Sequence, residues 1–580
     1  MIWQKNSTKP FLKTVCLVVS GLLFWGGVFI PSRGESSCDP SPSREESLLS
    51  TLSLEQKIGQ MLFFSFRGGP ASPELEDLLE RYAPGGLILY SSRGNVDSLE
   101  QTVALITGAQ EDARRYGMLP PFFSIDQEGG LIDRIRQGVT VFPGNMALGA
   151  AGDPELAKEQ ARVTASELRA LGITWNFAPV VDVNSNPANP VINIRSFGED
   201  PREVASLGVA MVRPYESEGV LCTPKHYPGH GDTHVDSHVG LPRVDRPLEV
   251  LEEVDLLPFR ETIRAGVPAV MTAHVLVPAL APENPELPAT LSREVLQGLR
   301  RQGFEGIIVT DSMGMGAIRQ GWGAKEAALL TVEAGADVLL YGADPDSGPS
   351  VFEEVFSGLV EGVRSGRISE RRIDESVLRI LTAKIRTRIL DDPFPREHWR
   401  DLLQKEESLE VSRRIAQESV TLVRNEGNLL PLSENARIPL LVPEERREEV
   451  LPLLEEVPQF FPLYVRSSLE EEPVPLSSEE VREIENAPCL GVASWGLTRY
   501  PGLGTLAKDF SEKPLLYLAL RSPYDLLQIP RAAAYLCTYG DTPASLEALG
   551  WILTGKALPK GKLPVELPGF YPRGWGMQDF

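Results

Sequence analysis

Short apolar runs rich in β-branched and aromatic residues recur along the first part of the chain. Amphipathic stretches lie between them. The runs cover residues 58–66, 85–90, 120–126, 173–183, 219–226, 269–277, 306–312 and 336–342. Continuous apolar strands that alternate with helices are typical of a parallel sheet covered on both faces. Eight such units over roughly 300 residues predict a (β/α)8 barrel of the TIM type, with a doubly wound sheet as the alternative.

Two of the intervening stretches carry helix signals. DPELAKEQARVTASELRALG, residues 153–172, has apolar positions at helical spacing. SREVLQGLRRQG, residues 292–303, ends in glycine after basic residues, as a helix terminus does. These stretches are predicted to be helices that cover the barrel.

The alternating pattern restarts after about residue 390. Residues 408–420 predict a helix, and the apolar runs IPLLV, CLGVASW, PLLYLALR and AAYLCTY follow. We therefore expect the barrel to span residues 45–390 and a smaller α/β domain to span 391–580. The acidic, proline-interrupted stretch 468–488 is expected to be a solvated connection or an exposed helix.

The N-terminus is of a different kind. Lys5, Lys9 and Lys13 precede the apolar run 15–30, and a polar segment follows. This order predicts a signal peptide or signal anchor plus linker over residues 1–44. The apolar run is short for a membrane span of about 20 residues. We expect an extracytoplasmic protein, periplasmic or secreted, whose only membrane attachment would be through this segment.

Composition narrows the range of partners. The net charge is −23 over 580 residues, which argues against nucleic acid because its phosphates would be repelled. The cysteines are scattered and form no CxxC pair, so the sequence predicts neither a disulfide framework nor a cysteine metal site. They are Cys16, Cys38, Cys222, Cys489 and Cys537.

The stretch KHYPGHGDTHVDSH, residues 225–238, carries four of the six histidines at every fourth position. On a helix this spacing would align the imidazoles as metal ligands. Pro228, Gly229 and Gly231 disfavour a helix, however, and the chain has no HExxH motif. We therefore expect a glycine-rich loop without a metal, and no cofactor elsewhere in the chain.

Polar residues stand at the carboxyl ends of five predicted strands. They are Asp126, Asp182, Lys225 with His226, His274 and Asp311. In a barrel these ends converge on one mouth, where active sites are built. Any single aspartate there could instead cap a helix. Together, without a metal motif or a phosphate-binding glycine loop, they favour chemistry on a neutral polyhydroxylated substrate such as a sugar.

Four stretches carry a resemblance to a known family. SIDQEGG (124–130), NPVINIRSFGEDP (189–201), the histidine loop and VTDSMGM (309–315) resemble glycoside hydrolase family 3, specifically its β-N-acetylglucosaminidase branch. The resemblance spans most of residues 50–390. ESVTLVRNEGNLLPL and LPKGKLPVELP also resemble the α/β sandwich domain of two-domain family members.

The resemblance implies a retaining exo-β-N-acetylglucosaminidase that releases terminal N-acetylglucosamine from cell-wall fragments, muropeptides or chitin-type oligosaccharides. Asp311 would be the nucleophile, His238 the general acid/base and Asp236 the carboxylate that orients it. Sugar hydroxyls would be held by Asp126, Arg134, Arg195, Lys225 and His226. His230 would shape the loop and His234 would be solvated. A carboxylate two residues from a histidine can fix the tautomer that an acid/base needs.

Three alternatives stay open at this point. A phosphorylase would use phosphate in place of water, since a histidine does not repel phosphate as a glutamate would. A broader β-glycosidase would not require the acetamido group. A non-catalytic wall-binding protein would have lost the nucleophile or the dyad, and both are intact here. The sequence departs from the family at Leu131, where arginine often follows DQEGG, which bears on the edge of the site.

Overall fold

The computed structural model describes residues 42–345, 347–469 and 475–580. The predicted targeting segment lies outside the described residues except for its last three positions. Within the described ranges, no helix combines the length and apolar character that a membrane crossing requires. The targeting segment and the extracytoplasmic location therefore stay predictions.

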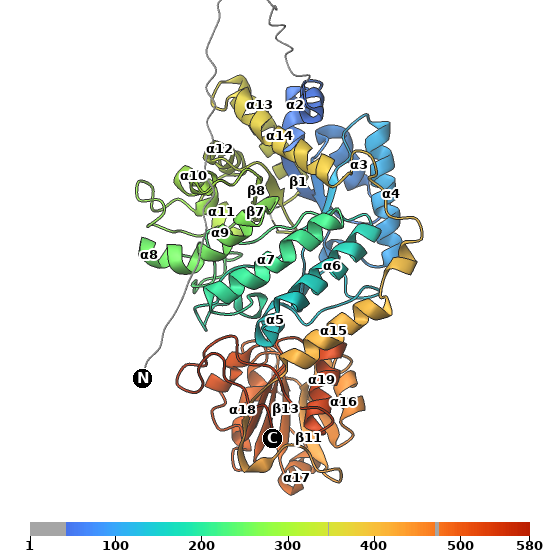
Figure 1. Cartoon of the computed structure of the whole chain (residues 1–580), viewed down its shortest axis with the longest axis vertical. Coiled ribbons are helices and arrows are strands. Elements are labelled where there is room, and N and C mark those ends of the chain that lie inside the picture. Colours follow the sequence, from blue (N-terminus) through green and yellow to red (C-terminus); the bar gives the residue numbers. More distant parts are fainter. Residues whose placement is uncertain (1–41, 346, 470–474) are drawn as a thin grey trace, which may run out of the picture. The chain divides into compact units, whose positions relative to one another are not determined.

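The first part of the chain, coloured from blue to yellow in Figure 1, forms a parallel barrel that strand pairing closes. Five strands pair in the order β6-β3-β2-β1-β9, and β7 pairs with β8. Residues 221–227 connect β6 to β7 through the Trp175–Leu221 and Tyr227–Thr272 bridges, and Val309–Val338 joins β8 to β9. The strands are β1 Leu62–Ser65, β2 Gly86–Ile88, β3 Phe122–Ile125, β6 Trp175–Asn176, β7 Ala269–Thr272, β8 Ile307–Thr310 and β9 Leu339–Tyr341.

The predicted barrel is confirmed, because each of the eight apolar runs supplies one strand position of the barrel. Residues 221–227 occupy their position through isolated bridges and backbone hydrogen bonds. The first run differs in detail. Its opening residues 58–60 end helix α2, and the strand begins only at Leu62. A short apolar run does not by itself distinguish a buried helix end from a strand.

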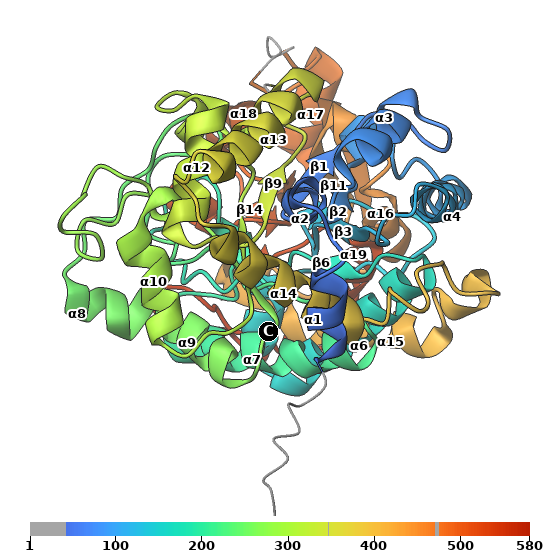
Figure 2. The same ribbon diagram turned by 90° about the horizontal axis from the view of Figure 1, so that it is seen from above.

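Helices surround the strands, as Figure 2 shows from above. They are α1 Arg44–Leu49, α2 Leu54–Gln60, α3 Pro73–Tyr82, α4 Leu99–Arg115, α5 Asn145–Ala151, α6 Pro154–Ala170, α7 Pro201–Ser217, α8 Leu248–Val250, α9 Leu257–Arg264, α10 Arg293–Arg301, α11 Gly316–Arg319, α12 Ala324–Ala334, α13 Pro349–Arg364 and α14 Glu370–Arg386. The two predicted helices correspond to α6 and α10, and side chains of Asp153 and Ser292 cap their amino ends.

Aromatic side chains fill the space beneath the site. Trp175 is fully buried and meets Phe63 and Phe122 edge to face, with ring centroids 5.2 and 5.1 Å apart. Its indole nitrogen donates to the Thr223 hydroxyl at 2.6 Å. Truncating a buried aromatic of this kind costs about 3–5 kcal/mol. This packing ties β1, β3 and β6 together below the polar strand ends.

A second, doubly wound sheet follows in the order β10-β15-β14-β13-β11-β12, parallel except for β10 against β15. Its strands are β10 Thr421–Asn425, β11 Ile438–Pro443, β12 Phe460–Val465, β13 Leu490–Ser494, β14 Leu515–Ala519 and β15 Ala534–Cys537. Its helices are α15 Glu406–Ser419, α16 Leu451–Glu456, α17 Ser478–Asn486, α18 Pro501–Asp509 and α19 Pro543–Leu553. The predicted α/β class of this part is confirmed.

Two strands of this sheet, its edge strands β10 and β12, were not predicted from the sequence. β12 contains Pro462 and alternates between buried and half-buried positions. It lies at the edge of the sheet, where a residue without a backbone N–H is tolerated. The acidic stretch contains α17, with Ser477 and Glu480 forming a capping box.

Residues Arg44–Phe580 form one compact unit. The segment after position 390 still contacts the barrel, since Arg44 pairs with Asp391 at 2.7 Å and Arg169 pairs with Asp392 at 3.0 Å. The loop after β6 also contacts the second α/β part, because the Asn184 side chain donates to the Tyr524 hydroxyl at 3.0 Å. The exact domain boundary at 390/391 stays a prediction.

Candidate active site

A cavity of about 260 Å³ opens at the carboxyl ends of the barrel strands. Its volume lies just below the range for drug-sized ligand sites, about 300–1,000 Å³. The structure brings together in its lining all predicted site residues except Asp236, which lies directly behind His238. They are Asp126, Arg134, Arg195, Lys225, His226, His238 and Asp311.

The cavity has an ion-paired floor. Glu128 accepts two bonds from Arg195, at 2.9 and 2.8 Å, and pairs with the Lys225 ammonium at 2.7 Å. Lys225 also binds Asp126 at 2.8 Å, and Arg134 reaches the other oxygen of Asp126 at 3.2 Å. Burial alone would raise the pKa of Asp126, but Lys225 and Arg134 hold it below its ordinary value. The floor therefore presents fixed charges that can bind pairs of hydroxyls.

Glu128 was quoted within a motif but received no role from sequence reasoning. It lies on β4 (Gln127–Gly129), which forms a hairpin with β5 (Ile132–Asp133). Burial would raise the pKa of Glu128, but Arg195 and Lys225 lower it well below its ordinary value. A buried, doubly paired carboxylate orients its cationic partners. The signal in the sequence was only its place two residues after Asp126.

The hairpin also positions Arg134. The Arg134 backbone N–H donates to the Gln127 side chain at 3.1 Å, and its guanidinium lies over the Tyr90 ring at 5.0 Å. The turn needs Gly130, which has φ +67° and would bring a Cβ within 2.6 Å of the Pro143 carbonyl oxygen. Leu131 lies at the tip, 37 % exposed, and is not part of the cavity lining. The departure from the family pattern therefore leaves the floor unchanged.

Asp311 follows β8 and faces the cavity. The Ser312 amide donates to its Oδ1 at 2.7 Å. Burial would raise the pKa of Asp311, but His226, His274 and His238 together with that amide hold it below its ordinary value. Below it, the His274 ring binds the Ser312 carbonyl at 2.9 Å and the Thr290 hydroxyl at 2.9 Å. Asp311 is therefore an ionised carboxylate on a rigid turn.

Asp182 organises the start of the histidine loop. Its Oδ2 accepts from His226 Nδ1 at 2.7 Å and from the His226 amide at 3.1 Å, while Oδ1 accepts from the His230 amide at 2.7 Å. Burial would raise the pKa of Asp182, but the two histidines lower it below its ordinary value. Because Asp182 engages Nδ1, the Nε2 atom of His226 faces the cavity and lies 3.4 Å from Arg195. The strand-ending aspartate therefore supports the loop from behind.

The other two histidines of the loop, His230 and His234, have different environments. His230 is buried, and its ring binds the Thr233 hydroxyl at 2.7 Å and the Ser237 hydroxyl at 3.0 Å. Burial lowers the pKa of His230 to about 4, so it is neutral at pH 7. His234 is exposed and faces the Asn186 amide. Across the described residues, no three His, Cys, Asp or Glu side chains form a group that could hold a metal ion.

The Asp236–His238 pair lies at the mouth of the cavity. Asp236 Oδ1 accepts from His238 Nδ1 at 2.8 Å and from the His238 amide at 2.8 Å. The His238 side chain is 59 % exposed and that of Asp236 is 39 % exposed. Because Asp236 engages Nδ1, Nε2 is the nitrogen available for proton exchange with a ligand.

The loop segment 237–239 rests on the residues that follow Asp311. The amides of Gly316 and Ala317 donate to the carbonyls of residues 238 and 237, each at 3.2 Å. The Gln320 side chain donates to the carbonyl of residue 239 at 2.7 Å. These contacts connect the histidine at the mouth to the turn that carries the buried carboxylate.

Gly316→Ala should therefore displace His238. The added Cβ would lie 2.6 Å from the His238 carbonyl oxygen, so the loop must shift. Misplacing a proton donor by about 1 Å can cost about 10²-fold. With His238 in the acid/base role that the family resemblance implies, we expect kcat/KM to fall by about that factor for an aryl glycoside with a poor leaving group, and much less for one with a nitrophenolate leaving group. Gly321→Ala is the matched control, since its nearest contact would be 3.9 Å away. Equal losses on both substrates would contradict this role.

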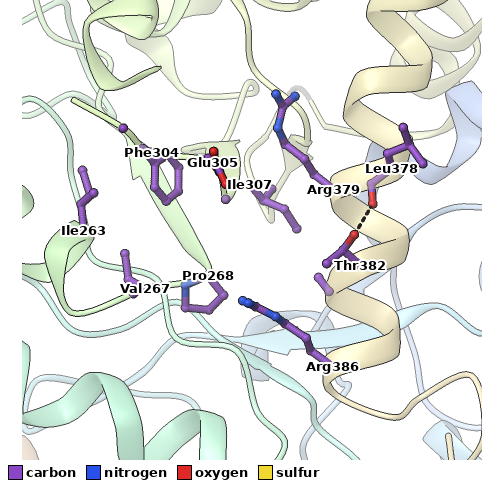
Figure 3. Close-up of a pocket in the computed structure, with 14 residues that line it drawn as sticks. Ile263, Val267, Pro268, Phe304, Glu305, Ile307, Leu378, Arg379, Thr382 and Arg386 are labelled. Atoms are coloured by element: carbon purple, nitrogen blue, oxygen red, sulfur yellow. Dashed lines mark hydrogen bonds between the residues drawn. The ribbon is translucent and has the colours of Figure 1, made fainter. Parts of the chain in front are cut away.

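A second cavity, of about 410 Å³, lies near the amino ends of β7 and β8 (Figure 3). Arg379 and Arg386 on α14 line it, and Arg386 extends toward Pro268. Arg379 is committed to Asp337 at 3.0 Å. Glu305 is the only carboxylate in its described lining, so this cavity offers no pair of catalytic carboxyl or imidazole groups.

Comparison with known proteins defines the class of this fold and site. Residues 53–383 match the family model described as the glycosyl hydrolase family 3 N terminal domain. The protein is therefore a glycoside hydrolase, an enzyme that cleaves glycosidic bonds. The chain belongs to glycoside hydrolase family 3.

Individual relatives agree with this assignment. The chain is 36% identical over 431 residues to β-hexosaminidase A of Pseudoalteromonas piscicida, covering 68% of this chain and 71% of that protein. It resembles the solved structure of a family 3 β-N-acetylglucosaminidase from Paenibacillus sp. str. FPU-7, with a TM-score of 0.81, 39% identity, and coverage of 89% and 99%. It also resembles a solved β-glucoside phosphorylase, with a TM-score of 0.78, 25% identity, and coverage of 90% and 96%.

Proposed function

We propose that the chain is a retaining exo-β-N-acetylglucosaminidase. The observation that carries the proposal is the pairing of an ionised, buried Asp311 with an exposed, carboxylate-bound His238 in one cavity. Retaining glycosidases need a nucleophile and a proton donor on opposite sides of the glycosidic bond. The small volume of the cavity supports removal of a single terminal sugar.

In the first step, Asp311 attacks the anomeric carbon and His238 Nε2 gives its proton to the leaving oxygen. A glycosyl ester of Asp311 forms and the aglycone departs. In the second step, His238 takes a proton from water, and the water oxygen displaces Asp311 from the same face that the aglycone left. Asp236 holds the imidazole tautomer and stabilises the imidazolium.

The floor residues would hold the terminal ring. Asp126 and Glu128 would accept hydrogen bonds from sugar hydroxyls, while Arg134, Arg195 and Lys225 would donate to them. Their mutual ion pairs hold these groups in place before the sugar arrives, which lowers the cost of ordering them on binding. His226 would present Nε2 to the same ring.

Preference for a 2-acetamido sugar is supported by the named relatives, a β-hexosaminidase and a β-N-acetylglucosaminidase. We expect kcat/KM for an aryl β-N-acetylglucosaminide to exceed that for the matched aryl β-glucoside by at least about tenfold. Parallel initial-rate measurements on the two substrates test this. Comparable values would reduce the assignment to a broader β-glycosidase.

The natural substrates we propose are β-linked N-acetylglucosaminyl oligosaccharides, either cell-wall fragments such as muropeptides or chitin-type chains. The predicted export of the chain supports an extracytoplasmic source. Phosphorolysis is the second candidate, supported by the likeness to a β-glucoside phosphorylase and by the use of a histidine in place of an anionic base.

A further inference from the structure

Asp344 is a fixed carboxylate at the rim of the active-site cavity that none of the proposed roles uses. It lies in the loop after β9 and lines the cavity. Its Oδ2 accepts a hydrogen bond from the Ser312 hydroxyl. Its carbonyl oxygen accepts from the Arg93 side chain at 3.1 Å. A Cβ on Gly314 would lie 2.8 Å from Oδ2, so the carboxylate packs directly against the turn that follows Asp311.

The charge of Asp344 is not neutralised by a cation. Asp126 and Glu128 on the floor pair with Lys225, Arg134 or Arg195. In contrast, among the residues that the structure describes, no lysine or arginine forms an ion pair with the Asp344 carboxylate. The cavity therefore carries a compensated floor and an uncompensated negative charge at its rim.

Asp344 shares the cavity with both proposed catalytic groups. It lines the cavity together with Asp311 and His238, and its hydrogen bond from Ser312 joins it to the residue next to Asp311. Burial and the charge of Asp311 raise the pKa of Asp344 above its ordinary value, although the Ser312 hydroxyl and His238 lower it. In the proposed mechanism the aglycone leaves and the acceptor arrives through this cavity.

We propose that Asp344 selects the acceptor of the second step, favouring neutral water over phosphate. The inference rests on the proposed function, because it concerns the glycosyl ester on Asp311. With water, the C1–Oδ bond to Asp311 breaks, a C1–O bond forms, and one proton passes to His238. With phosphate, the same bond breaks, the phosphate oxygen bonds to C1, and the bonding pair returns to Asp311.

Phosphate is an anion, so the negative charge of Asp344 repels it as it approaches. Water is neutral and is not repelled. Like charges placed close together in a partly desolvated cavity repel strongly. His238 alone would admit either acceptor, since a neutral imidazole does not repel phosphate. The rim carboxylate thus supplies the discrimination that the acid/base residue lacks.

The test is the partition of the glycosyl enzyme between acceptors. Wild type and Asp344→Asn are given an aryl β-N-acetylglucosaminide over a series of phosphate concentrations, and free sugar and sugar 1-phosphate are quantified. We expect the ratio of sugar 1-phosphate to sugar to rise about tenfold in the variant at each concentration. The partition toward methanol, a neutral acceptor, should stay at the wild-type value.

Asp97→Asn is the matched control, since Asp97 is an exposed aspartate outside the cavity lining. Asp344→Glu, which restores the charge, should return the ratio toward wild type. A ratio unchanged in Asp344→Asn, an equal change in Asp97→Asn, or an equal rise toward methanol would overturn the inference. A wild type that forms mainly sugar 1-phosphate would also overturn it. A wild type that releases no sugar from the substrate under any condition would instead contradict the proposed function.

Discussion

Replacing Asp311 with alanine will reduce kcat on an aryl β-N-acetylglucosaminide by at least about 10⁴-fold. Without this carboxylate no glycosyl ester forms, and both steps of the reaction are lost. The side chain follows a buried strand, and its main structural contact is with the adjacent Ser312 amide. Thermal unfolding of the variant should therefore show a cooperative transition near that of the wild type, which separates lost chemistry from lost structure.

Azide gives a stereochemical test of the same assignment. In Asp311→Ala, a small anion can enter the space left by the carboxylate and attack C1 opposite the leaving group. The product should be the α-glycosyl azide. No rescue, or formation of the β-azide, would argue against Asp311 as the nucleophile.

Replacing His238 with alanine will separate the two steps on a substrate whose leaving group needs little protonation. The first step should proceed, while attack by water on the glycosyl ester should slow by about 10²- to 10⁴-fold, the usual contribution of positioned proton transfer. Rapid mixing should therefore show a burst of phenol followed by slow turnover. Intact mass measurement should detect one sugar on Asp311.

His234→Ala is the control for this experiment, because His234 lies in the same loop but is exposed and faces Asn186. It should behave as the wild type. Azide added to His238→Ala should accelerate turnover and give the β-azide, since it attacks the glycosyl ester. Wild-type turnover of His238→Ala without a burst or an adduct would mean that another group is the acid/base.

The barrel could be predicted because its strands are continuous apolar runs, a strong local signal. Residues 122–125 and 307–310 are buried on both faces, so nearly every position in them is hydrophobic. Edge strand β12 gives no such signal, because it is half exposed and contains Pro462. Sequence reasoning therefore found the central strands of both sheets and missed the two edge strands of the second, β10 and β12.

Sequence reasoning placed some residues in the candidate site and missed others. Asp126 and Asp311 end buried strands, and the rule that barrel active sites form at these ends placed them at one mouth. Glu128 lies on a short hairpin, and its partners Arg195 and Lys225 come from segments after β6. Asp344 lies on a loop without a recognisable motif. Neither could be assigned a partner before the fold brought distant segments together.

The sequence by itself determined the order of strands and helices, the absence of a helix in the histidine loop, and the residue types at the strand ends. Periodicity, proline and glycine are local properties of the chain, so local reasoning suffices for them. Only the tertiary structure decided which charges are compensated. It paired Glu128 with Arg195 and Lys225 and placed His238 against Gly316. Among the described residues, it left the carboxylate of Asp344 without a lysine or arginine partner. These relations join residues far apart in the chain, and electrostatic energy depends on distance and burial, which spacing along a sequence does not contain.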